Sequence, residues 1–200
     1  TTEQYLRIKA IARDIAPRYA VTDNGGNILI KGIPDPEWRK LIKMKTEEEC
    51  LPIRDAIRKF ENICSEQWVK TTRIADELFF YCVIKNKAPE PADELNAYFE
   101  YLEKHNWRTA RHGRKLYFIP ECVNKRDAVS YIAEQHNITK IISAGDSVLD
   151  LDMADISDLF ISPCHGEICQ RYGDKEDRVM CTENYGIRAS DEIVEKILGA

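Results

Sequence analysis

The sequence lacks the long apolar runs that a membrane protein needs. Its longest uninterrupted apolar stretch, residues 78–84, is far shorter than the roughly 20 residues of a transmembrane helix. It also lacks an excess of positive charge, since 29 Lys and Arg stand against 34 Asp and Glu, for a net charge of -5. Nucleic acids are bound through basic patches that neutralise phosphates, so we expect neither a nucleic acid nor a membrane as partner.

Cysteine is present in seven copies, but no Cys-x-x-Cys pair occurs. An odd number without paired spacing favours reduced thiols over a disulfide framework. A zinc site drawn from Cys164, His165, Cys169 and Cys181 is the alternative, but the spacing fits no common zinc pattern and Pro163 indicates a loop. With 44% hydrophobic and 32% charged residues and no visible cleavable signal, the composition predicts a cytoplasmic enzyme domain.

The most informative segment, residues 140–158, combines a short apolar strand with a cluster of carboxylates. The strand runs into Gly145, and the acidic residues that follow are Asp146, Asp150, Asp152 and Asp155. The carboxyl ends of parallel strands open onto a crevice where ligands bind. Carboxylates suit Mg²⁺, which takes one or two of them together with water and phosphate oxygens. The segment therefore predicts phosphate chemistry at a magnesium site; the alternative is a loop in which Asp146 only caps the next helix.

The run Gly-Asp-Ser-Val-Leu-Asp at residues 145–150 resembles the last signature motif of the haloacid dehalogenase (HAD) superfamily. Members of this superfamily are mostly Mg²⁺-dependent phosphatases, and the motif reads GDxxxD or GDxx(N/D)D after a hydrophobic strand. Asp146 and Asp150 match its acidic positions, whereas Leu149 stands where many relatives carry Asn or Asp. The resemblance implies that Asp146 holds Mg²⁺ and that Asp150 supports the site from the outer shell.

Other segments resemble the superfamily branch with a large α/β cap, called type IIB. A Lys begins the helix before the GD strand in that branch, and Lys125 matches it in the run Lys-Arg-Asp-Ala-Val. Its ammonium group is suited to neutralise charge on a transferring phosphoryl group. The alternative is that Lys125 is a solvated surface lysine without a role in the reaction. Residues 19–28 resemble the entry to the cap, where Asn24-Gly25 is a strong tight-turn signal and Asn24 a candidate substrate contact. Residues 182–187 resemble the segment before the closing helix of the family.

The nucleophile motif of the family is missing from these residues. HAD phosphatases carry DxDx(T/V) after an N-terminal strand, and its first Asp attacks phosphorus to form an aspartyl-phosphate. No such motif follows a suitable strand here, because Asp150-Leu151-Asp152 lies inside the GD motif. The chain opens on Thr1-Thr2-Glu3-Gln4, a capping box for a helix that follows the Thr/Ser motif in relatives. We therefore expect the nucleophile upstream of residue 1, and residues 1–200 alone to be inactive and unstable.

The sequence predicts an α/β fold with a Rossmann-like parallel-sheet HAD core, at residues 1–25 and 118–200, and an inserted α/β cap at residues 26–117. Helices are expected at 1–16, 36–45, 47–62, 91–105 and 125–136. Strands are expected at 19–22, 27–30, 77–85, 107–111, 115–119, 141–143 and 158–163. Candidate contacts to the leaving group are the polar tips of the cap: Arg111, His112 and Arg114 at one hairpin, and also Arg73 and Lys85. A solvated face is the alternative for each of them.

The resemblance implies a Mg²⁺-dependent phosphomonoesterase that acts on a small phosphorylated metabolite, such as a sugar phosphate. The main alternative is a non-catalytic scaffold or regulator that keeps the fold but lacks the nucleophile. A receiver-like phosphoacceptor is a third hypothesis, and the large insert between Asn24 and Lys125 argues against it. We make no prediction of the oligomeric state.

Overall fold

The computed structural model describes residues 2–11, 17–173 and 178–200 of the chain. The chain divides into two compact units, Thr1–Asn124 and Lys125–Ala200, which we call unit 1 and unit 2. The predicted grouping of residues 1–25 with residues 118–200 in one core stays a prediction, because contacts within the chain assign residues 1–124 to unit 1. None of the described helices is long and apolar enough to cross a bilayer.

Unit 1 begins with a helix that contacts a small antiparallel sheet. The elements are α1 (Thr2–Ile11), β1 (Tyr19–Thr22), the turn η2 (Asp23–Gly25), β2 (Asn27–Ile30) and β3 (Ile33–Pro34). The predicted tight turn is confirmed, because Asn24 has a φ of 54° and Gly25 a φ of 103°. Asn and Gly accept this left-handed backbone better than other residues. The predicted strands are confirmed as well, and the part of the predicted helix at 12–16 lies outside the described residues.

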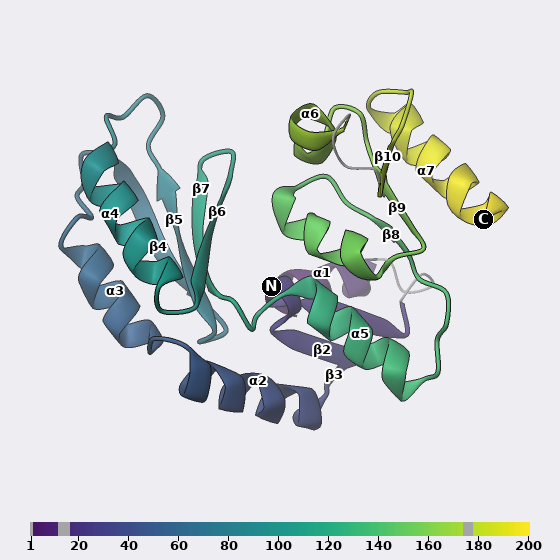
Figure 1. Ribbon diagram of the computed structural model, residues 1–200, viewed down its shortest axis with the longest axis horizontal. Coiled ribbons are helices and arrows are strands. Elements are labelled where there is room, and N and C mark those ends of the chain that lie inside the picture. The colour runs from purple at the N-terminus through teal and green to yellow at the C-terminus, as the bar shows by residue number, and fades with distance from the viewer. Residues whose placement is uncertain (1, 12–16, 174–177) are drawn as a thin grey trace. The chain divides into compact units, whose positions relative to one another are not determined.

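The rest of unit 1 is a four-stranded antiparallel sheet, in the order β4-β5-β7-β6, with helices on one face (Figure 1). Its elements are α2 (Pro36–Glu49), α3 (Ile53–Glu61), β4 (Val69–Ala75), β5 (Phe79–Ile84), α4 (Ala92–Glu103), β6 (Trp107–His112) and β7 (Lys115–Pro120). Aromatic side chains fill the space between helices and sheet, and Phe80 and Phe118 stack with ring centroids 4.6 Å apart. Phe60 of α3 lies 4.9 Å from Phe118, and Tyr98 of α4 donates a hydrogen bond to the Ala56 carbonyl.

One expectation for this part of unit 1 is wrong, and one strand was not expected. The single helix predicted at 47–62 is broken, because α2 ends at Glu49, Cys50 is extended and α3 begins only at Ile53. Pro52 explains the break, since a proline disfavours helical backbone in the residue before it. Strand β4 was not predicted, because four of its seven residues are polar and its middle is largely exposed, as is common at the edge of a sheet.

Unit 2 is built on a three-stranded parallel sheet in the order β10-β9-β8. Its elements are α5 (Lys125–Gln135), β8 (Ile142–Ala144), the 3-10 segment η3 (Val148–Ile156), β9 (Leu159–Ser162), α6 (Glu167–Tyr172), β10 (Val179–Cys181) and α7 (Ile187–Gly199). Parallel strands need crossover connections, and η3 and α6 lie within them. Phe160, Ile161 and Ile168 are fully buried at the centre of the unit. The predicted parallel core sheet is confirmed.

The cysteine prediction is wrong for one pair, because Cys169 and Cys181 form a disulfide bond. The elements α6 and β10 bring them together although their spacing matches no motif. The other five cysteines are free thiols, as predicted. The disulfide removes two ligands of the zinc alternative, and no group of three or more His, Cys, Asp or Glu suited to a metal ion occurs in the described parts of the chain.

Candidate active site

The Gly145–Asp146 loop continues directly from the carboxyl end of β8. Its first amide, Gly145 N, donates a hydrogen bond of 3.1 Å to the carbonyl of Ile161 in β9, which ties the loop to the sheet. A Cβ atom at position 145 would stand 2.2 Å from the Cβ of Asp150. Only glycine therefore allows the side chain of Asp150 to lie against the loop. The GD motif needs both its glycine and its second aspartate for this packing.

The carboxylate of Asp150 is fully engaged inside unit 2. Its Oδ2 accepts hydrogen bonds from Asp146 N (3.2 Å), Ser147 N (3.1 Å) and Ser147 Oγ (2.9 Å). Its Oδ1 accepts a hydrogen bond from Lys125 Nζ. Burial alone would raise the pKa of Asp150, but the charge of Lys125 and these hydrogen bonds lower it below its ordinary value of 3.8. Asp150 is thus a fixed anion that orders the loop.

Lys125 is the first residue of α5, and its ammonium group reaches the GD loop through this ion pair. The side chain of Lys125 is 27% exposed and that of Asp150 is 13% exposed. An ammonium group has three donors, and the contact with Asp150 uses one of them. The structure therefore places Lys125 beside the motif that its sequence position suggested, with donors left for an anion.

Asp146 differs from Asp150 because its carboxylate is exposed. Among the described residues its carboxylate has no hydrogen bond or ion pair. Its backbone is nevertheless fixed, since Asp146 O accepts a hydrogen bond of 3.3 Å from Ile168 N at the start of α6. Gly166 packs against it so closely that a Cβ there would lie 3.2 Å from the Asp146 Cα. A positioned backbone with an uncommitted carboxylate is what a single-carboxylate Mg²⁺ ligand requires.

Asp155, a further acidic residue of the segment, has other partners. Asp155 pairs with Arg178, and Arg126 lies 3.9 Å from its second oxygen. Both arginines neutralise it at the surface of unit 2. Of the predicted carboxylate cluster, the structure therefore brings together Asp146 and Asp150, with Lys125, and leaves Asp155 outside.

Unit 1 contains a hollow of about 510 Å³, within the size range of small-molecule sites. The exposed face of the four-stranded sheet, helix α1 and the turn η2 line it. Its charged and aromatic lining residues include Arg7, Arg73, Asp76, Tyr81, Lys115 and Tyr117. Arg73, Tyr81 and Tyr117 lie on one rung of the sheet, because Arg73 is opposite Tyr81 and Tyr81 is opposite Tyr117. The two tyrosine rings are 5.4 Å apart, and the ammonium of Lys115 lies 5.5 Å from the Tyr81 ring.

Two carboxyl groups share the floor of this hollow. Asn27 Nδ2 donates to both Asp23 Oδ2 and Asp76 Oδ2, each at 3.1 Å. Burial and the neighbouring Asp23 raise the pKa of Asp76, whereas the hydrogen bonds from Asp76 and Asn27 lower the pKa of Asp23 in spite of its burial. Asp23 Oδ1 is buried and has no hydrogen-bond partner among the described residues. The hollow therefore offers acceptors as well as cations.

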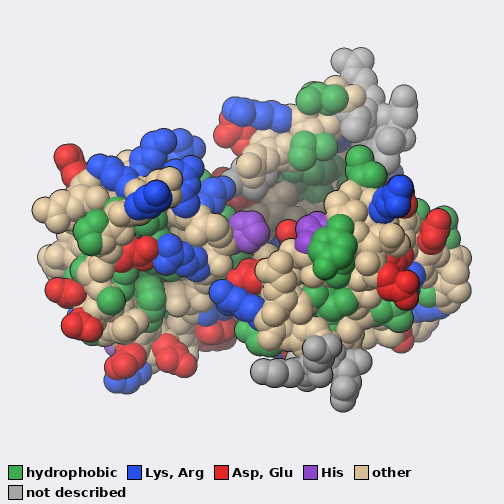
Figure 2. All heavy atoms as spheres, turned by 90° about the horizontal axis from the view of Figure 1, so that it is seen from above, with side chains coloured by type: hydrophobic (Ala, Val, Ile, Leu, Met, Phe, Trp, Pro, Cys, Tyr) green, Lys and Arg blue, Asp and Glu red, His purple; other side chains and the backbone are tan. Residues whose placement is uncertain are grey.

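The structure separates the predicted substrate contacts into two groups. Asn24 lines the hollow, as does Arg73, but Arg111, His112 and Arg114 are not among its described lining residues. Arg111 is held by Glu90 through two hydrogen bonds of 3.0 and 3.1 Å. His112 and Arg114 are exposed at the hairpin between β6 and β7. Figure 2 shows Lys and Arg side chains gathered on one face of this part of the chain.

Sequence reasoning missed Tyr81, Lys115 and Tyr117. The alternation of side chains along β5 and β7 was a usable signal, because it puts these residues on the face opposite buried Phe80, Cys82, Leu116 and Phe118. Their proximity depends on the strand order, which the sequence does not reveal.

Solved structures of other proteins share this fold. The sucrose-phosphatase of Synechocystis sp. PCC6803, solved with sucrose and phosphate, has a TM-score of 0.76 at 15% identity over 98% of this chain and 80% of that chain. The HAD subclass IIB sugar phosphatase BT4131 has a TM-score of 0.65 at 9% identity over 96% of this chain and 78% of that chain. Protein 0175 of Thermoplasma acidophilum has a TM-score of 0.65 at 13% identity over 97% of this chain and 77% of that chain. The likeness defines the class: an α/β protein with a HAD core and a cap.

The family follows from the sequence comparison. Residues 1–166 match the family model of sucrose-6F-phosphate phosphohydrolase, and the chain belongs to this family. No curated protein sequence matches the chain at a significant level. The predicted membership of the HAD superfamily and its type IIB branch is confirmed. The chain therefore belongs to a family of phosphatases.

Proposed function

We propose that the protein is a Mg²⁺-dependent phosphomonoesterase whose substrate is a small phosphorylated sugar. The observation that carries the proposal is the pairing of an exposed, uncommitted Asp146 with the fixed Lys125–Asp150 ion pair beside it. Two similar structures, a sucrose-phosphatase and a sugar phosphatase, support the substrate class. A cytoplasmic location stays a prediction from the sequence.

Each residue of the site has a distinct proposed task. Asp146 would hold Mg²⁺, and the bound ion would supply positive charge that stabilises the oxygens of the transferring phosphoryl group. Lys125 would add a second positive charge from α5. Asp150 fixes the loop amides and the direction of the Lys125 ammonium group, so that neither has to reorganise when the substrate arrives.

The nucleophile is proposed to be an Asp outside these 200 residues, in a DxDx(T/V) segment that precedes residue 1. Attack by its carboxylate would give an aspartyl-phosphate, which water then hydrolyses. Among the described strands, β8 pairs only with β9, so its other edge has unpaired backbone groups that a further strand can satisfy. We accordingly expect residues 1–200 alone to hydrolyse no phosphate ester.

The hollow of unit 1 is the proposed site for the sugar. Arg73 and Lys115 offer donors for hydroxyl oxygens, and the acidic pair Asp23 and Asp76 offers acceptors. The ring of Tyr81 offers an apolar surface with a polar tip, which suits the mixed surface of a sugar ring.

A non-catalytic regulator of the same fold is the second candidate. The observation that favours it is the absence of a DxDx(T/V) motif after a suitable strand in the 200 residues. Such a protein would keep the Asp146 loop and the hollow, and would bind a phosphorylated sugar without hydrolysing it.

The test uses the full-length protein and two substrates, an aryl phosphate and a sugar phosphate. We expect hydrolysis of both that depends on Mg²⁺, and a DxDx(T/V) motif in the sequence before residue 1. Trapping the labelled phosphoryl group on that Asp would identify the intermediate. Binding of the sugar phosphate without turnover, in a full-length protein that lacks the motif, would favour the regulator instead.

A further inference from the structure

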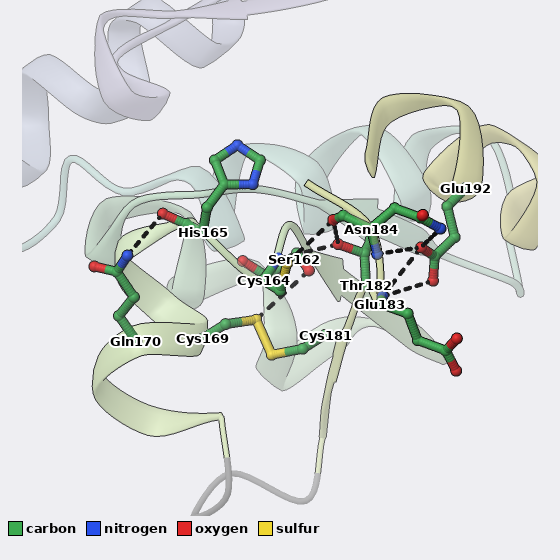
Figure 3. The surroundings of a disulfide bond; sticks show 10 residues. All are labelled: Ser162, Cys164, His165, Cys169, Gln170, Cys181, Thr182, Glu183, Asn184 and Glu192. Atoms are coloured by element: carbon green, nitrogen blue, oxygen red, sulfur yellow. Dashed lines mark hydrogen bonds between the residues drawn. A yellow bond between two sulfur atoms is a disulfide. The ribbon is translucent and has the colours of Figure 1, made fainter. Parts of the chain in front are cut away.

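The disulfide between Cys169 and Cys181 joins α6 to the end of β10 (Figure 3). Both cysteines are partly exposed at the edge of the unit 2 core, where they pack beside Phe160 and Ile168. Small thiols can therefore reach the bond. The other five cysteines are free thiols. Cys50 and Cys122 stay unbonded although their sulfur atoms are 3.8 Å apart.

The helix that carries Cys169 also supports the Asp146 loop. Ile168 N donates to Asp146 O at 3.3 Å, and Glu167 Oε2 accepts a hydrogen bond of 3.4 Å from Val148 N. Helix α6 has only six residues, and so short a helix is unstable without anchors to the rest of the fold. Its anchors are the buried side chain of Ile168 and the disulfide of the next residue, Cys169. Loss of the disulfide should therefore loosen the support of the Asp146 loop.

The surroundings of Cys169 also accommodate a thiol. Its Sγ lies 3.5 Å from the carbonyl oxygen of Ser162 (Figure 3). A disulfide sulfur carries no hydrogen, so this contact is not a hydrogen bond while the disulfide is intact. Reduction would create an S–H donor that finds an acceptor already in place. Both oxidation states of Cys169 thus have a local partner.

We propose that the Cys169–Cys181 pair is a reversible redox switch that controls cation binding at Asp146. The disulfide form holds α6 against the Asp146 loop, and the dithiol form releases it. The proposal rests on the proposed function in one respect, namely that Mg²⁺ binds at Asp146.

The reducing agent is a dithiol. One of its thiolates attacks a sulfur of the pair, which breaks the S–S bond, releases one cysteine and joins the other to the dithiol in a mixed disulfide. The second thiolate of the dithiol then attacks the dithiol sulfur of that mixed disulfide and releases the cysteine still bound there. The two cysteines gain two electrons and two protons, and the dithiol becomes a cyclic disulfide.

The experiment compares the oxidised full-length protein with the same protein reduced by dithiothreitol. Hydrogen exchange should show loss of protection at the amides of Val148 and Ile168 on reduction, with unit 1 unchanged. The Kd for Mg²⁺, measured by calorimetry, should rise by about tenfold or more, the scale on which groups behind a metal ligand act. Reoxidation should restore both values. Cys169→Ser and Cys181→Ser should each reproduce the reduced state and abolish the response, whereas Cys64→Ser, which removes a free thiol of unit 1, should retain it.

Two outcomes would overturn the switch. One is alkylation of Cys169 and Cys181 in the unreduced protein as readily as Cys64. Another is exchange protection and Mg²⁺ affinity that do not change on reduction, even if phosphatase activity is present. A protein without phosphatase activity whose Mg²⁺ affinity still falls on reduction would contradict the proposed function and leave the switch standing.

Discussion

Replacement of Lys125 by methionine separates its role in the reaction from its role in the fold. Met keeps an unbranched apolar stem but removes the charge that the carboxylate of Asp150 contacts. Loss of one positioned group that stabilises transition-state charge typically raises the barrier by about 3 kcal/mol. We therefore expect Lys125→Met in the full-length enzyme to lower kcat by about 100-fold or more, measured with an aryl phosphate.

Stability should fall in the same variant, because Asp150 keeps its charge without its cation. Removal of one partner of a fully buried ion pair costs about 3–5 kcal/mol. Lys125 is 27% exposed, and Asp150 retains its loop amides and Ser147, so we expect a smaller loss, about 1–2 kcal/mol by urea unfolding at pH 7. The double variant Lys125→Met/Asp150→Asn should recover part of this loss, since contacting pairs couple by about 0.5–3 kcal/mol.

The matched control is Lys196→Met, which removes another lysine of unit 2 that contacts a carboxylate, here Glu192 at 3.5 Å. This i,i+4 pair on α7 should contribute little to stability, with turnover unchanged. Wild-type turnover in Lys125→Met would refute the reasoning and return Lys125 to a structural role. Equal losses of activity in the two lysine variants would refute it as well.

Three further predictions concern other parts of the account. Gly145→Ala should destabilise unit 2 by about 1–3 kcal/mol and weaken Mg²⁺ binding, because its Cβ would stand 2.2 Å from that of Asp150. The control is Gly199→Ala, whose Cβ would have no atom within 4 Å. Calorimetry measures the stability and the Mg²⁺ binding of both variants. Hydrogen bonds from Asn184 and the backbone of Glu183 lower the pKa of Glu192 from 4.5 to about 2 (Figure 3), so its stabilising contribution is present above pH 4.5 and is lost as the pH falls toward 2. Glu192→Gln should accordingly flatten the loss of stability over that range in thermal unfolding. Tyr81→Ala should raise KM for a sugar phosphate about tenfold or more and leave KM for an aryl phosphate nearly unchanged, whereas equal effects on both substrates would argue against the hollow as the sugar site.

The parts of the fold that were predicted correctly depend on local backbone chemistry. The turn at Asn24-Gly25 follows from residues that accept a positive φ, and the hairpin of β6 and β7 from two short strand segments around Gly113. The GD loop was predicted because a short apolar strand runs into Gly145 and is followed by a cluster of carboxylates. The break before α3 was missed although Pro52 marks it, because the apolar periodicity on both sides continues through it.

The parts that were missed depend on contacts between distant residues. Cys169 and Cys181 meet only because the fold brings α6 next to the end of β10, and no spacing rule encodes this. The hollow of unit 1 draws on α1, β4, β5 and β7, so its composition depends on the strand order. Arg111 was predicted as a substrate contact from its position at a hairpin, but the sequence does not show that Glu90 binds it.

The central claim is that Asp146 holds the magnesium ion of a phosphatase. The most direct test is a Mg²⁺ titration of full-length Asp146→Asn, with binding followed by calorimetry and hydrolysis by release of phosphate. Asn keeps the shape but removes the charge that a hard cation requires, so binding should be lost and turnover should fall by orders of magnitude. Asp191→Asn removes an exposed carboxylate from α7 of the same unit and should behave as the wild type. Unchanged Mg²⁺ affinity and turnover in Asp146→Asn would contradict the assignment.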